Sequence, residues 1–135
     1  MRGAFYSALA TGVPGVRVGD AAAVAAAETA LVDALWVRRK AARGKLVAAQ
    51  HVLHSSLVAT NLRLARERER RRGHKLRSFG LGRHVEQTLS PDDLAALTVN
   101  ATCSVEALTQ AVAHQRATLI RLMAELVPAW QPPLE

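Results

Sequence analysis

Apolar residues recur at intervals of three and four along most of the chain, which is the pattern of helices that bury one face. The most regular stretch runs from about 45 to 72. Its apolar side consists of Leu46, Ala49, Leu53, Leu57, Thr60 and Leu64. This is the spacing of a coiled-coil seam, and it predicts a long helix that Gly73 ends.

An Ala-rich segment, about 21 to 43, precedes this stretch and has Leu31 and Leu35 on one side. Small side chains let a neighbouring helix approach closely, so we expect this segment to be a closely packed helix. Gly44 leaves two interpretations open, because a glycine inside a helix costs only about 1 kcal/mol. The chain either turns near 41 to 45 or continues as one helix to about 72.

A third helix is predicted to begin at the sequence Ser90-Pro91-Asp92-Asp93. Serine is a preferred N-cap residue, proline suits the first helical position, and the two carboxylates face the positive end of the helix dipole. The apolar positions continue at helical spacing to a stop near Pro128. An unbroken helix over this range would be about 55 Å long.

We therefore predict an all-α fold with coiled-coil-like packing. Residues 45–72 and 91–127 are expected to form a long antiparallel helical hairpin, with 21–43 as a third layer or as an arm for another protein. The residues predicted to pack in the helix seams, within the fold or against a partner, are Leu31, Leu35, Leu46, Leu53, Leu57, Leu64, Leu97, Leu108, Leu119, Leu126 and Trp130.

The segments outside the helices complete the predicted organisation. Residues 1–19 are expected to be a flexible N-terminal segment, and 20–127 a single helical domain with a basic connector at 73–89. The Pro-rich tail 128–135 is expected to be extended. Trp130 in this tail either covers the end of the hairpin or anchors a partner.

Composition limits the kinds of protein to consider. The chain has 135 residues, of which 50% are hydrophobic and only 4% aromatic, with one cysteine. A single cysteine forms no internal disulfide, which favours an intracellular location, cytoplasmic or nuclear. Two arginines and no acid in residues 1–19 leave mitochondrial import as an alternative. No stretch is long and apolar enough to predict a transmembrane segment.

The positive charge is concentrated between Arg63 and Arg83. Nine of the chain's 18 Lys and Arg residues lie there with only Glu67 and Glu69, so this run matches the whole formal net charge of +7. Its predicted role is to bind an acidic partner through Arg66, Arg68, Arg70, Arg71, Arg72, Lys75, Arg77 and Arg83. The alternative is a solvated helix face with local ion pairs.

Candidate catalytic and metal-binding groups are sparse. His51 and His54 could share a metal ion, but no carboxylate or thiolate follows at a matching spacing. Cys103 lacks a nearby cation that would activate its thiol, so we expect a small buried apolar residue. The run Gly80-Leu81-Gly82 follows no predicted strand and precedes no Lys-Ser or Lys-Thr pair, so it is not a phosphate loop.

The sequence thus predicts a non-enzymatic structural or adaptor subunit of a larger assembly, with no metal or cofactor. Its seams would bind helices of other proteins, and its basic elbow would meet an acidic surface. The alternative is a protein that binds the phosphate backbone of RNA or DNA, as in a ribonucleoprotein. A third reading is a peripheral protein on an anionic membrane surface.

Overall fold

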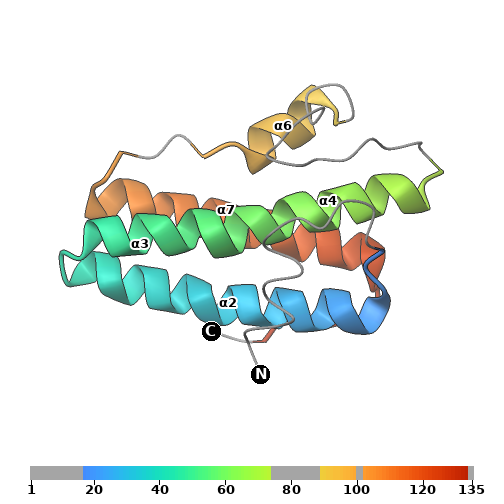
Figure 1. The fold of residues 1–135 in the computed structure, drawn as a ribbon, viewed down its shortest axis with the longest axis horizontal. Helices are drawn as coiled ribbons and strands as arrows, with labels where there is room; N and C mark the ends of the chain where they lie inside the picture. Colours follow the sequence, from blue (N-terminus) through green and yellow to red (C-terminus); the bar gives the residue numbers. More distant parts are fainter. Residues whose placement is uncertain (1–16, 74–88, 100–101, 134–135) are drawn as a thin grey trace.

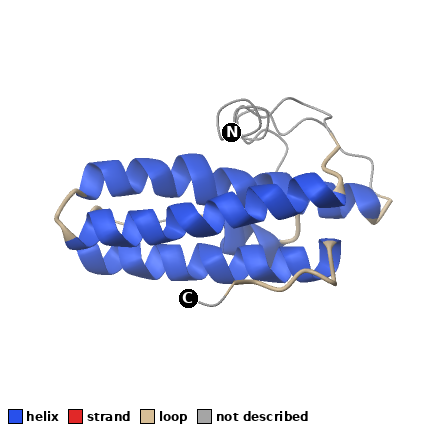
Figure 2. Cartoon of the chain, turned by 90° about the horizontal axis from the view of Figure 1, so that it is seen from below, coloured by secondary structure: helices blue, strands red, loops and turns tan. Residues whose placement is uncertain are grey.

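The computed structural model describes residues 17–73, 89–99 and 102–133. These ranges contain only helices and their connections, without a strand (Figure 2). The elements are α2 (Asp20–Ala42), α3 (Leu46–Val52), the π-helix η1 (Leu53–Val58), α4 (Ala59–Arg71), α6 (Pro91–Leu97) and α7 (Val105–Leu126). The predicted all-α class is confirmed.

Three rods lie side by side (Figure 1). One is α2, the second is the continuous series α3, η1 and α4, and the third is α7. The conformation of Gly44 decides between a turn and one continuous helix through the first two rods. Gly44 has a φ of 80°, a left-handed conformation that favours glycine, and its N–H donates to the carbonyl oxygen of Ala41 at 2.9 Å. The chain therefore turns at Gly44, and α2 and the second rod form an antiparallel hairpin.

The direction of the third rod corrects the predicted hairpin. Asn61 Nδ2 donates to the carbonyl oxygen of Gln115 at 3.0 Å, and Arg71 Nη1 donates to that of Leu126 at 3.0 Å. Because the residue numbers rise together along both helices, α4 and α7 run parallel. The stretch 45–72 does pack beside α7, but its antiparallel neighbour is α2. The helix α7 therefore begins at the end of the bundle where α3 begins (Figure 1).

The expected single helix over 91–127 is also divided. Thr98, after α6, is extended with φ −85° and ψ 130°. The Ser104 hydroxyl caps α7 by accepting a hydrogen bond from the Ala107 N–H at 3.2 Å. The short helix α6 packs on α7, where the Ala96 carbonyl oxygen lies 3.0 Å from His114 Nε2. Ser104 is thus a second helix start that the leucine spacing alone did not reveal.

Two apolar clusters fill the bundle. The cluster at the end where α2 begins contains Leu31, Leu64, Leu97, Leu119 and Leu126, and Trp130 packs against it. The cluster near Gly44 contains Leu53, Leu57 and Leu108, with Leu46 packed against it. Leu35 differs from the other predicted seam residues, because 40% of its surface is exposed.

Candidate interaction surfaces

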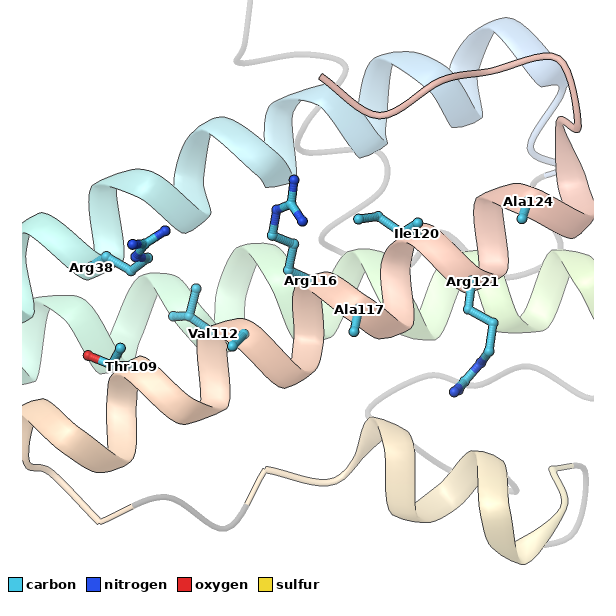
Figure 3. A pocket seen from close by; sticks show the side chains of 9 residues that line it. Arg38, Thr109, Val112, Arg116, Ala117, Ile120, Arg121 and Ala124 are labelled. Carbon is cyan, nitrogen blue, oxygen red and sulfur yellow. The ribbon is translucent and has the colours of Figure 1, made fainter. Parts of the chain in front are cut away.

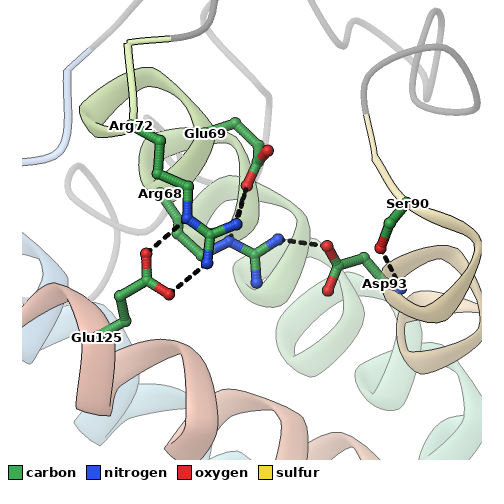
Figure 4. Close-up of polar contacts among 6 residues, drawn as sticks. All are labelled: Arg68, Glu69, Arg72, Ser90, Asp93 and Glu125. Atoms are coloured by element: carbon green, nitrogen blue, oxygen red, sulfur yellow. Dashed lines mark hydrogen bonds and ion pairs between the residues drawn. The ribbon is translucent and has the colours of Figure 1, made fainter.

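The predicted acidic-partner run begins in the second half of α4, where Arg68 is buried. Its Nε lies 2.9 Å from Glu69 Oε2, and its Nη2 lies 2.6 Å from Asp93 Oδ2 (Figure 4). Asp93 is in the first turn of α6, where its N–H donates to the Ser90 hydroxyl at 3.2 Å. This contact confirms the predicted cap at Ser90. Arg68 therefore joins α4 to the start of α6.

Arg72 connects α4 to α7 in the same network. Its Nη1 lies 3.0 Å from Glu69 Oε2, and its Nη2 lies 2.5 Å from Glu125 Oε1 (Figure 4). Hydrogen bonding to Glu125 raises the pKa of the Arg72 guanidinium further above its already high ordinary value. Arg72 thus stays charged and shares its charge with two acids of its own chain.

Glu67 is the centre of a second group of contacts. Its side chain is 2% exposed and accepts hydrogen bonds from Arg70, from Arg71 Nε at 2.8 Å and from the Val18 N–H at 3.0 Å. Burial by itself would raise the pKa of Glu67, but these hydrogen bonds hold the pKa below its ordinary value. Glu67 is therefore a buried carboxylate that folding keeps ionised.

Arg71 extends this group to the chain segments beside α4. It donates to the carbonyl oxygens of Val18 at 2.8 Å and Leu126 at 3.0 Å, and its Nη2 lies 2.9 Å from Asp20 Oδ1. The hydrogen bond to Glu67 is the main cause that raises the pKa of Arg71. Arg71 thus links the beginning of α2 and the end of α7 to α4.

These positions change what can be expected of the basic run. The structure brings together Arg68, Arg70, Arg71 and Arg72, and each is bonded to an acid of the same chain. Arg66 is buried as well. An external anion would have to displace these internal partners, so the geometry favours the alternative of local ion pairs. The remaining predicted residues, Lys75, Arg77 and Arg83, lie outside the described residues.

Exposed cations gather instead around the turn at Gly44, at the opposite end of the second rod. Arg38, Arg39, Arg43 and Lys45 are all exposed. The sequence has no acid between positions 33 and 67. This acid-free interval is the sequence signal for the group, and it is less dense in cations than the run that follows it. These four cations are therefore exposed near one turn of the chain, in an interval of the sequence that contains no acid.

A strip of large apolar side chains is exposed on α2. Val32 is 64% exposed, Leu35 40% and Trp36 37%. The Nζ of Lys40 lies 5.1 Å from the centre of the Trp36 ring, which stabilises that ring on the surface. We call Val32, Leu35 and Trp36 the α2 strip. Neighbouring exposed apolar residues commonly mark surfaces that bind other molecules.

A groove of about 600 Å³ lies between α2 and α7 (Figure 3). We call it the α2–α7 groove. It is lined by Arg38 from α2 and by Thr109, Val112, Ala113, Arg116, Ala117, Ile120, Arg121 and Ala124 from α7. These lining residues include three arginines and no acid. The leucine spacing of α7 predicts its buried face but not this neighbouring side, whose sequence signal is the alanine spacing at 113, 117 and 124.

Groups considered for chemistry are dispersed. His51 and His54 are exposed, and no cluster of three or more His, Cys, Asp or Glu suited to a metal ion occurs among the described residues. Cys103 is exposed in the link before α7, so its predicted burial within a helix is wrong. The reason is the break between α6 and α7. Gly80 and Gly82 lie outside the described residues.

Comparisons with known proteins identify no relative of this chain. No protein-family model matches the chain, and no curated protein or solved structure is significantly similar to it. In the part of the chain that the structure describes, no helix is both long and apolar enough to cross a membrane.

Proposed function

We propose that the protein is a non-enzymatic helical adaptor or structural subunit that binds helices of other proteins in a larger assembly. The observation that carries the proposal is the α2 strip, where Val32, Leu35 and Trp36 are exposed beside a completed core. Full burial of an apolar side chain contributes about 1.5 to 3 kcal/mol relative to full exposure, and each of these residues would gain the share that is still exposed. A partner that covers the strip would gain this stabilisation.

The bundle supplies a firm support for such a surface. The α2 helix packs on both other rods through buried Ala23, Ala27, Ala30, Ala34 and Ala41. Small side chains hold the helix axes close together, so the outer side of α2 is held in a fixed position. A preformed surface loses little conformational entropy when a partner binds.

In this proposal the acidic surface of the partner meets the cations near Gly44. Arg39, Arg43 and Lys45 are exposed there and close to the α2 strip in sequence. The buried arginines of α4 serve the fold itself. We also propose an intracellular location, because an exposed free thiol at Cys103 suits a reducing compartment.

Substitution of the α2 strip tests the proposal. The double variant Val32→Glu, Leu35→Glu should keep its helical circular dichroism, because both side chains are exposed, and should lose partners that co-purify with the wild-type chain. The matched control is His51→Glu, which adds a carboxylate at an exposed site on α3. If the double variant keeps the same partners in the same amounts, the proposal is wrong.

Binding to the phosphate backbone of a nucleic acid is a second candidate, favoured by the exposed cations Arg38, Arg39, Arg43 and Lys45, which lie in an interval of the sequence without acids. If about four phosphates are contacted, log affinity should fall with log salt at a slope of about −3 to −4. Charge reversal at Arg39 and Arg43 should remove most of that slope. A slope near zero, or the same slope in the reversed variant, would reject this candidate.

A further inference from the structure

We propose that the α2–α7 groove docks an amphipathic helix of a partner protein, with a stripe of small apolar residues flanked by Glu or Asp on both sides. This inference rests on the proposed adaptor function and names the chemistry of the partner. The groove adjoins the α2 strip at Leu35 but is lined by other residues, so substitutions in its lining test it separately.

The shape of the groove suits a helix. Its α7 side is formed by Thr109, Ala113, Ala117, Ile120 and Ala124, which follow one another at intervals of three and four and therefore lie along one side of α7. The stretch from 109 to 124 spans about 22 Å at 1.5 Å per residue, or about four helical turns. Three of the five residues are alanines, so a partner helix can approach to a normal packing distance of about 8 to 10 Å.

The position of the groove leaves room for a further helix. On another side of α7, Gln115 is buried against Asn61 of α4, and Thr118 is buried near the carbonyl oxygen of Ala96 in α6. The groove residues Ala113, Ala117 and Ala124 are exposed. A helix in the groove would contact α2 and α7 and would be the fourth rod of a bundle, a common helical arrangement.

The arginines of the groove indicate which charges the flanks of the partner helix should carry. Arg116 points toward α2, whereas Arg121 points away from it, with Ala117 and Ile120 between them (Figure 3). Arg38 adds a cation on the α2 side. Cations along both edges of an apolar floor complement carboxylates on both sides of a helix better than the single anionic head of a lipid.

Leu35 of α2 and the C-terminal tail lie beside the groove. Leu35 precedes Arg38 by three residues, so it lies on the same side of α2 and extends the apolar surface outward. The C-terminal tail comes near α7 about halfway along the groove, where Arg116 Nη2 lies 3.5 Å from the carbonyl oxygen of Pro133. Trp130 holds the preceding part of the tail against the core.

Designed helical peptides test this proposal on the full chain by fluorescence anisotropy. One labelled peptide carries an Ala and Leu stripe with Glu on both flanks, and its control has the same stripe with Lys flanks. We expect the Glu peptide to bind at least about tenfold more tightly, a difference of about 1.4 kcal/mol. The variant Ala117→Trp should fill the exposed groove and weaken the binding of the Glu peptide by a similar factor.

Charge reversal gives the decisive comparison. The double variant Arg38→Glu, Arg121→Glu should exchange the preference, so that the Lys peptide binds more tightly. Circular dichroism on both variants checks that they remain folded, and Arg17→Glu, at an exposed position outside the lining, serves as the charge-reversal control. Equal binding of both peptides, unchanged binding by Ala117→Trp, or displacement of the bound peptide by an RNA oligonucleotide would overturn the proposal. If this happens while the α2 strip still determines which proteins co-purify, the adaptor function stands and only the groove assignment fails.

Discussion

Ser56 donates a 2.7 Å hydrogen bond to Asp33 inside the core, where the two residues are 1% and 2% exposed. Ser56 belongs to the π-helix η1, and Asp33 belongs to α2, so the contact joins the two arms of the hairpin. A wider π turn inside an otherwise α-helical rod commonly marks a local constraint. Here it accompanies a serine that reaches a buried carboxylate on the neighbouring helix.

Ser56→Ala should therefore destabilise the fold by about 1.5 to 3 kcal/mol, because a buried carboxylate loses a hydrogen-bond donor. Urea unfolding followed by circular dichroism measures the change. His54→Ala, at an exposed position of the same π-helix, is the control and should stay within about 0.5 kcal/mol of wild type. Equal effects of the two substitutions would show that the hydrogen bond contributes little.

Arg68 and Arg72 should differ in their contribution to stability although they lie one turn apart. Arg68→Ala removes the contact to Asp93 and one of the cations bonded to the buried Glu69, which keeps Arg72, and should cost about 3 kcal/mol. Arg72 has a side chain that is 44% exposed, so Arg72→Ala should cost about 1 kcal/mol or less. The measurement is the free energy of unfolding in urea. Similar losses for both would contradict an internal structural role for Arg68.

Glu67 should make the fold sensitive to acid. Its pKa in the folded protein lies below the ordinary value of 4.5, so its stabilisation is fully present above that value and is lost as the pH falls through the folded pKa. The free energy of unfolding of wild type should therefore fall more steeply below about pH 4.5 than that of Glu67→Gln. Glu106→Gln, at an exposed position of α7, should follow the wild-type curve. Parallel curves for wild type and Glu67→Gln would refute this prediction.

Gly44 should resist substitution because its φ of 80° is left-handed. Gly44→Ala should cost about 1 to 2 kcal/mol through backbone strain, since no atom lies within 4 Å of the added methyl group. Gly19 has a φ of −69° and is equally open, so Gly19→Ser is the control and should not destabilise. Thermal unfolding compares the two variants. A Gly44→Ala protein as stable as wild type would mean that the hairpin turn is not strained.

The helix-periodic pattern predicted the all-α class and most of the buried positions. It identified Leu53, Leu57, Leu64, Leu108 and Leu119, because each lies on the apolar face of a long helix. Apolar spacing specifies the face of a helix that is buried. Two helices with such faces pack equally well whether they run parallel or antiparallel. The apolar spacing therefore could not predict that α4 and α7 run parallel.

The ion pairs of α4 show a second limit. The acids that neutralise Arg68 and Arg72 include Asp93 and Glu125, which are distant in sequence. A count of charges along the chain cannot find such partners, so the sequence predicts an acidic-partner surface and leaves local ion pairs as the alternative. The interval without acids around Gly44 was readable from the sequence. The exposure of its cations became clear only from the fold.

Site-specific photo-cross-linking tests the central claim, an adaptor that binds other proteins through the outer side of α2, most directly. Benzoylphenylalanine replaces Leu35 in one version of the chain and His51 in another, and both are irradiated in the cells that make the protein. We predict a discrete protein adduct from position 35 that is absent from position 51. No protein adduct at position 35, or the same adducts from both positions, would contradict the account.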